Sequence, residues 1–325
     1  MTPPPTPFDL AREAFLAACR LDVETPKPGN VSVESAGHGM TAAQFLASAQ
    51  AAAGPLFAHG APVGKRILDA VARTREVAGC NTNLGIVLLV APLAASLAAS
   101  LATSLTAPLI ATLNERDEPD ESRGEALTAQ RWRAATERVL AQLTVDDARD
   151  AYRAIALANP GGLGDAPEQS VHDAPTVDLR AAMQLAAQRD SIARQYANGF
   201  ADIFETGLAA VDEMPAEAPR LVTLNVFLTF LASHPDSHIV RKHGMALAQS
   251  VTLAARAQHG RWRAAATQTP DQSALRDLYA WDTELKSRGI NPGTSADLTV
   301  ATLFVAGRLA PQGWVRAPAA RGDET

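Results

Sequence analysis

Thirty consecutive residues, Leu84–Leu113, carry no charged side chain. A run of this length and apolarity either crosses a membrane or forms a helix that is buried on every side in a helical core. Pro92 and Pro108 interrupt the run, serines and threonines are scattered along it, and the polar Asn81-Thr82-Asn83 leads directly into it. These features favour the buried helix. We therefore predict a central apolar helix and no membrane span.

Helical periodicity continues along the rest of the chain. Strand-type alternation is scarce, and aromatic residues, which sheets favour, make up only 5% of the sequence. We predict an all-α fold, a single compact multi-helix domain. Apolar residues at helical spacing occur in Leu10–Val23, Ala42–Ala58, Val63–Val77, Ala126–Leu143, Val145–Ala158, Leu179–Ala210, Arg220–Leu231, Ile239–Ala257, Gln272–Arg288 and Ala296–Leu309.

Interruptions in this pattern set the expected limits of the domain. Residues 1–9 are rich in proline, lack the basic and apolar segments of a secretory signal, and are expected to be a flexible lead-in. The domain should span residues 10–310 and be followed by a flexible tail, 311–325. The charged segment 115–124 is expected to be a mobile loop within the domain, because the motifs described below lie on both sides of it.

Charge and cysteine content narrow the class of protein. The net charge of −6 argues against a general nucleic-acid binder, which would carry a basic surface, but a local cationic patch could still bind a nucleotide. Cys19 and Cys80 are too few for a disulfide framework. These observations indicate a cytoplasmic protein.

Three short segments combine glycine with amide, cationic or carboxylate side chains. Each lies at the edge of a helical segment, where free backbone N–H groups and a polar side chain can bind a phosphate or a sugar. We expect them to form three walls of one polar site. In chain order, the first, middle and last signatures are Thr25-Pro26-Lys27-Pro28-Gly29-Asn30, Gly79-Cys80-Asn81-Thr82-Asn83-Leu84-Gly85 and Asn291-Pro292-Gly293-Thr294-Ser295-Ala296-Asp297.

The first signature presents a lysine between two prolines. The prolines stiffen the backbone around Lys27, and Gly29 permits the close approach of a ligand. Lys27 is therefore either a phosphate-binding lysine or a solvated side chain in a turn that ends a helix. Asp22 and Glu24, about one turn earlier, are candidate bases or metal ligands, or else surface acids.

In the middle signature, Asn81, Thr82 and Asn83 precede the apolar helix. One of them suffices to cap that helix. The others either face a nucleobase edge or a ribose hydroxyl, or satisfy buried backbone groups.

Between the middle and last signatures, Ser233–Gly244 gathers three histidines, one carboxylate and two cations. A helix that begins near Asp236 would place Arg241 and Lys242 one to two turns further on. A transition-metal site at His238 and the histidine four residues before it is an alternative, but a proline follows that earlier histidine and no His-Glu-x-x-His pattern is present.

The last signature runs into a helix. Thr294 or Ser295 would cap this helix, and Asp297 would lie in its first turn, where the helix dipole favours a carboxylate. Alternatively, Ser295 contacts a ribose and Asp297 binds Mg²⁺.

The order and spacing of the signatures resemble the triphosphoribosyl-dephospho-CoA synthase family. The family pattern runs Pro-Lys-Pro-Gly, then Asn-Thr-His-Lys-Gly, then Pro-Gly-Gly-Ser-Ala-Asp, and the resemblance spans residues 12–306. It implies a pentosyltransferase that moves the triphosphoribosyl group of ATP to the 2′-hydroxyl of 3′-dephospho-CoA and releases adenine. Its partners would be these small molecules, and apolar helix faces are compatible with a homodimer.

The resemblance also implies roles for the candidate residues. Mg²⁺, as a cofactor, would hold the triphosphate together with cationic side chains. The base for the acceptor hydroxyl stays open among Asp236, Glu24 and His238. The expected phosphate and substrate contacts are Lys27, Gly29, Asn30, Asn81, Asn83, Arg241, Lys242 and Ser295, and the expected metal ligands are Asp236 and Asp297.

One departure from the family pattern affects the expected substrate. Asn83 and Leu84 stand where the pattern has His and Lys, which removes a titratable group and a cation. A divergent paralogue is therefore an alternative, one that makes an α-ribofuranosyl linkage in a one-carbon carrier of the tetrahydromethanopterin type. A non-catalytic nucleotide-binding helical module is a second alternative, and it predicts nucleotide binding without adenine release.

Overall fold

The computed structural model describes residues 5–102, 127–160, 169–171, 173–266 and 272–310. Every regular element in these ranges is helical, which confirms the all-α prediction. The elements are α1 (Pro7–Glu24), α2 (Ala42–Leu56), α3 (Val63–Ala78), α4 (Leu84–Ala102), α5 (Ala129–Ala141), α6 (Val145–Ala158), α7 (Leu179–Ala186), α8 (Ser191–Asn198), the π-helical turn η1 (Asp202–Gly207), α9 (Leu208–Asp212), α10 (Pro219–Ser233), α11 (Ser237–His243), α12 (Met245–Ala266), α13 (Gln272–Ser287) and α14 (Gly293–Leu309).

Helix boundaries follow local signals. Thr6, Thr41 and Thr144 each cap a helix, and the N3 side chain of that helix bonds back to the cap in a capping box. Helix α1 begins at Pro7, so the last three residues of the predicted lead-in, 7–9, are helical. The charged segment 115–124, the glycine-rich segment 161–165 and the tail 311–325 lie outside the described residues.

Two segments expected to be continuous helices are divided. Asp190 accepts hydrogen bonds from the backbone of Ile192 and Ala193 and starts α8, and Gly199, with φ +65°, ends it. Gly244, with φ +87°, separates α11 from α12. These caps change the direction of the chain, and both α8 and α11 line the cavity described below.

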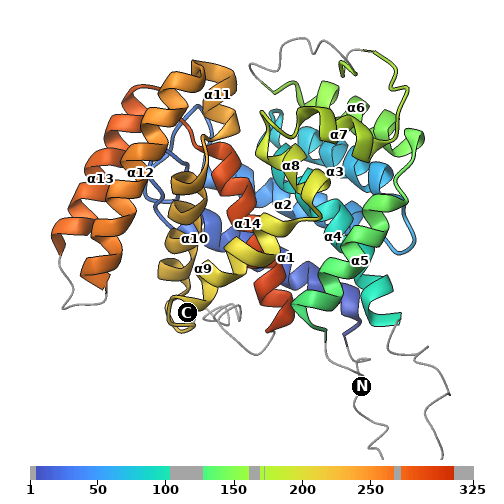
Figure 1. Ribbon diagram of the computed structural model, residues 1–325, viewed down its shortest axis with the longest axis horizontal. Helices are drawn as coiled ribbons and strands as arrows, with labels where there is room; N and C mark the ends of the chain where they lie inside the picture. The colour runs from blue at the N-terminus through green and yellow to red at the C-terminus, as the bar shows by residue number, and fades with distance from the viewer. Residues whose placement is uncertain (1–4, 103–126, 161–168, 172, 267–271, 311–325) are drawn as a thin grey trace, which may run out of the picture.

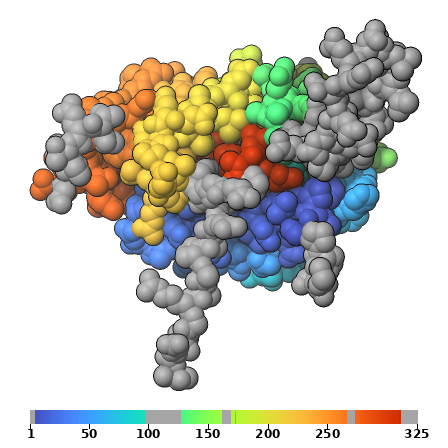
Figure 2. All heavy atoms as spheres, turned by 90° about the horizontal axis from the view of Figure 1, so that it is seen from below, coloured from blue at the N-terminus to red at the C-terminus, as the bar shows by residue number. Residues whose placement is uncertain are grey.

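Two apolar cores are joined through shared helices. The larger core draws residues from α1 to α10 and from α14, and the smaller one from α10 to α14. Helices α10 and α14 contribute to both, and Figure 1 shows them between α12 and α13 on one side and α3, α6 and α7 on the other. Helix α1 packs along α14, so the first and last described helices belong to the same packed unit (Figure 2).

The described part of the apolar run is buried. From Leu84 to Ala94 every residue of α4 is in the buried class. No helix among the described residues combines the length and apolarity that a membrane crossing needs. The described side chains of α4 therefore pack against other helices.

Candidate active site

A cavity of about 620 Å³ lies where the three signatures meet. Asn30 comes from the first signature, residues 79–85 from the middle one, and Asn291, Gly293 and Asp297 from the last. Further walls come from α6, α7, α8 and α11. Segments far apart in the sequence thus line one cavity.

The middle signature forms the turn before α4. Gly79 ends α3 in the left-handed conformation, and Asn81 caps α4 by accepting a bond of 3.1 Å from the Leu84 N–H. Thr82 donates to Ser48 over 2.6 Å. Asn83 is 4% exposed and lines the cavity, and neither atom of its amide has a hydrogen-bond partner among the described residues.

Asp297 faces the same turn. A Cβ atom on Gly85 would lie 2.0 Å from Asp297 Oδ2, so only glycine leaves room for the carboxylate. From Thr294 to Arg308, Asp297 is the one residue that is only partly buried, and it lines the cavity. Burial raises the pKa of Asp297 well above its ordinary value, and the nearby charges of Asp236 and Asp22 add to this effect.

The helix dipole does not explain why a carboxylate stands at position 297, because the residue is not in the first turn of the helix, where the sequence predicted it. Helix α14 begins at Gly293, so Asp297 lies in its second turn, and neither Thr294 nor Ser295 caps the helix with its side chain. Access to the cavity is the better explanation for this carboxylate.

Lys27 is not exposed to the cavity, contrary to the phosphate-binding prediction. Its side chain is fully buried, and its ammonium lies 3.1 Å from Asp22 Oδ1 and donates to the Asp22 and Thr25 carbonyls. Asp22, which is 4% exposed, lines the cavity in its place. Burial raises the pKa of Asp22, and the charge of Lys27 partly offsets that rise.

Gly29 also serves a different purpose from the one predicted. Its φ is +78°, and a Cβ atom there would lie 2.8 Å from Pro292 Cδ and 2.9 Å from the Ile290 oxygen. The glycine therefore allows the first signature to pack against the last, not against a ligand. The neighbouring Asn30 completes this contact by donating to Asn291 Oδ1 over 3.0 Å.

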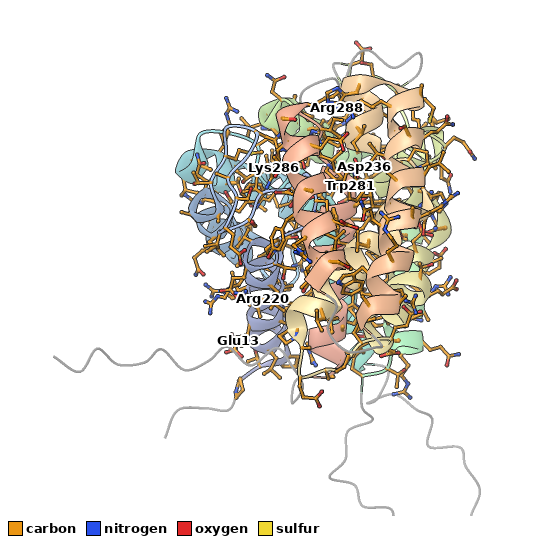
Figure 3. The ribbon with its side chains drawn as sticks, turned by 90° about the vertical axis from the view of Figure 1, so that its left-hand side faces the viewer. Glu13, Arg220, Asp236, Trp281, Lys286 and Arg288 are labelled. Carbon is orange, nitrogen blue, oxygen red and sulfur yellow. The ribbon has the colours of Figure 1, made fainter. Side chains whose placement is uncertain are left out.

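Asp236 is not available as a metal ligand or base. Its Oδ1 accepts from the backbone of His238 and Ile239, and its Oδ2 accepts from the backbone and hydroxyl of Ser295 at 2.7 and 2.8 Å. Neither Asp236 nor Ser295 lines the cavity. Figure 3 shows Asp236 toward the same end of the molecule as Lys286, away from Glu13 near the start of α1. Asp236 and Ser295 connect α11 to α14, which is a different position from the cavity wall that their predicted roles would need.

The other predicted residues of this region do reach the cavity. His238, Arg241 and Lys242 line it, whereas Glu24 does not. Burial and the nearby cations, first Lys242 and then Arg241, lower the pKa of His238 to about 3. Its Nε2 atom has no partner among the described residues. His238 is therefore neutral at pH 7.

Arg241 is held in place by the carboxylate of Asp190. Its Nη1 donates to Asp190 Oδ2 over 2.7 Å. Arg194, which lies four residues after Asp190, pairs with Asp202. No three His, Cys, Asp or Glu side chains in the described part of the chain form a metal-binding group, so a zinc site has no ligand set there.

Sequence reasoning missed several wall residues. Arg75 and Arg189 add cations to the rim, and Tyr152, Ile155 and Met183 form an apolar wall from α6 and α7. Arg75 lies one turn before the middle signature, and Arg189 directly precedes the cap residue Asp190. These positions are only weak sequence signals that the two arginines line a site. The apolar residues of α6 and α7 have the pattern of any amphipathic helix and carry no signal of a site.

The chain is similar to known proteins in sequence and in fold. The sequence matches the family model CitG, ATP:dephospho-CoA triphosphoribosyl transferase, over residues 9–316. The fold resembles a crystal structure from Archaeoglobus fulgidus of a protein provisionally named a triphosphoribosyl-dephospho-CoA synthase, with 21% identity and a TM-score of 0.55 over 81% of this chain and 97% of that chain. At this identity, the likeness shows a shared fold. No curated protein sequence matches the chain.

Proposed function

Because the chain belongs to the CitG family, ATP:dephospho-CoA triphosphoribosyl transferase, we propose that it transfers the 5-triphosphoribosyl group of ATP to the 2′-hydroxyl of 3′-dephospho-CoA. The bond between ribose C1′ and adenine N9 breaks, and a bond between C1′ and the acceptor oxygen forms. The hydroxyl proton leaves, and adenine takes up a proton. The observation that carries the proposal is the single cavity onto which all three signatures open.

Cations on the rim suit the triphosphate. Arg75, Arg189, Arg241 and Lys242 all line the cavity, and charge-assisted bonds from arginine favour phosphate oxygens. Asp190 holds Arg241, so less conformational entropy is lost when a phosphate binds. Lys27 has no part in this contact, because its ammonium is buried against Asp22.

The donor set also fits Mg²⁺ brought in by the nucleotide. Mg²⁺ commonly binds one or two carboxylates together with substrate phosphates and water. With Asp236 occupied by its bonds to α11 and α14, Asp297 is the predicted ligand that still faces the cavity. The nearby carboxyls of Asp236 and Asp22 would favour a cation beside it. Bound there, the metal would neutralise phosphate charge.

His238 is the proposed base for the acceptor hydroxyl. It is neutral and lines the cavity, and its Nε2 has no partner in the described part of the chain. Lys242 and Arg241 lower its pKa, so a triphosphate bound to these cations would offset their charge and make the imidazole a stronger base. All of these groups belong to one chain.

Adenine release tests the proposal. The protein is incubated with ATP and Mg²⁺, with and without dephospho-CoA, and adenine is quantified by liquid chromatography. Acceptor-dependent adenine is the expected result, and a His238→Ala variant should release much less while still binding ATP. A folded, ATP-binding protein that releases no adenine under these conditions would contradict the dephospho-CoA reaction.

One observation favours a second candidate. Leu84, 8% exposed, lines the cavity where the family pattern has a lysine. An apolar side chain there suits a less charged donor or acceptor, such as the alcohol of a tetrahydromethanopterin-type precursor in an α-ribofuranosyl transfer. Adenine or another base released only with such an acceptor would support this candidate. Nucleotide binding without release for any acceptor would support a non-catalytic module.

A further inference from the structure

Asn83 has a buried amide whose hydrogen bonds are not satisfied by the described residues. Its side chain lies on the cavity wall and is 4% exposed, and both Nδ2 and Oδ1 lack partners there. Leaving a buried donor or acceptor unpaired costs about 1–3 kcal/mol, so such an amide is expected to meet a bound molecule. The neighbouring Asn81 and Thr82 already have partners within the protein.

The surroundings of Asn83 define the chemistry of that molecule. Leu84, Ile86 and Leu88 of α4 and Ile192 of α8 line the same cavity. Ile192 Cδ1 lies 2.8 Å from the position of a Cβ atom on Gly85, so this isoleucine packs directly against the turn. A ligand group with apolar faces and an adjacent donor and acceptor on its edge fits here, and a nucleobase has this form.

We propose that Asn83 selects the nucleobase of the donor, by pairing its amide with the adenine N6 amino group and the ring nitrogen beside it, N1 or N7. An asparagine amide pairs in this bidentate manner with the N6 and N7 atoms of adenine in DNA. The inference rests on the proposed function, because it takes ATP as the donor. It goes further in assigning base selection to a residue at which this chain departs from the family pattern.

A binding cycle tests the pairing without requiring turnover. The affinities of ATP and of purine riboside triphosphate, which lacks the N6 amino group, are measured by calorimetry for the wild type and for Asn83→Leu, an apolar variant of similar size. The wild type should bind ATP at least about tenfold more tightly, and the variant should bind the two nucleotides equally. Asn83→Asp keeps an oxygen acceptor for the N6 amino group but loses the Nδ2 donor to the ring nitrogen, so it should bind both nucleotides more weakly and still prefer ATP.

Two controls complete the design. Inorganic tripolyphosphate should bind the wild type and Asn83→Leu equally, which shows that the phosphate subsite is intact. The affinities of 1-deaza-ATP and 7-deaza-ATP identify the ring nitrogen, because only the analogue that lacks the contacted nitrogen should bind the wild type more weakly. A preference for ATP that persists in Asn83→Leu would overturn the inference.

The inference and the proposed function can fail separately. If ATP is preferred through Asn83 but no adenine is released, the base-selecting role stands and the proposed reaction falls. If adenine is released and Asn83→Leu still prefers ATP, the reaction stands and the role of Asn83 falls. A wild type that binds neither nucleotide contradicts both.

Discussion

The buried pair of Lys27 and Asp22 is the residue-level feature with the largest expected effect on stability. Lys27 is fully buried and lies 3.1 Å from Asp22 Oδ1. Replacing Lys27 with Met leaves a buried carboxylate without its counter-ion, which typically costs about 3–5 kcal/mol. We expect a loss of this size in the free energy of unfolding of Lys27→Met, measured by urea denaturation.

Two further variants separate this effect from a role in phosphate binding. Asp22→Asn combined with Lys27→Met removes both charges and should recover part of the lost stability. Lys65→Met removes an exposed pair with Asp69 and should cost at most about 1 kcal/mol. A Lys27→Met protein of unchanged stability that no longer binds ATP would contradict the structural role and restore the phosphate-binding hypothesis.

Residue types pointed to the site, but the direction of each side chain did not follow from the sequence. Glycine, proline and asparagine mark turns at helix ends, so the meeting of the three signatures could be expected. The burial of Lys27 depends on its packing in the tertiary structure, and the bonds of Asp236 depend on Ser295, fifty-nine residues further along the chain. Local pattern holds no information about such pairings.

At the level of elements, Asp236 joins the start of α11 to the start of α14. It caps α11 through His238 and Ile239 and receives two bonds from Ser295. Loss of an N-cap costs about 1 kcal/mol, and hydrogen bonds to a charged group contribute about 1.5–3 kcal/mol more. We expect Asp236→Ala to lower the free energy of unfolding by about 3 kcal/mol.

A single-helix cap provides the comparison. Thr41→Ala removes the cap of α2, where the Gln44 N–H donates to the Thr41 hydroxyl over 3.3 Å, and should cost about 1 kcal/mol in the same denaturant assay. An Asp236→Ala protein as stable as the wild type, but with a lost Mg²⁺ requirement, would instead support the original prediction of a metal ligand.

The helical segments were largely predictable because their caps and apolar spacing are local features. The breaks at Asp190 and Gly244 were not, since a cap aspartate or a single glycine also occurs inside longer helices. These two breaks orient α8 and α11, and through them Asp190 and Arg241. The two helix boundaries that the sequence did not predict therefore determine where these site residues lie.

At the scale of the whole molecule, one helix connects the two cores and the cavity. Helix α14 contributes Leu298 and Val300 to the larger core and Ala296 to the smaller one, while Asp297 between them faces the cavity. The sequence suggested one unit because the signatures lie on both sides of the charged segment. The chain packs as one unit because α10 and α14 contribute side chains to both cores.

Protonation of His259 should link global stability to pH. This residue of α12 is 9% exposed and stacks on Trp262 of the smaller core, and its Nε2 lies 2.8 Å from Asn225 Oδ1. Burial, followed by the charge of Arg263, lowers its pKa from 6.5 to about 4. The unfolded chain therefore takes up this proton at a higher pH than the folded one. The contribution of His259 to stability is complete above pH 6.5 and is lost as the pH falls toward 4.

A matched variant isolates this contribution from opposing ones. Burial raises the pKa of Asp22, Asp236 and Asp297 in the folded protein, so these carboxyls add stability as the pH falls. Both they and His238 remain in His259→Gln, which lacks only the imidazole. Between pH 7 and pH 5, the free energy of unfolding of the wild type should fall by about 2 kcal/mol relative to that of the variant, as measured by urea denaturation. Parallel pH curves for the two proteins would show that His259 is not buried in its neutral form.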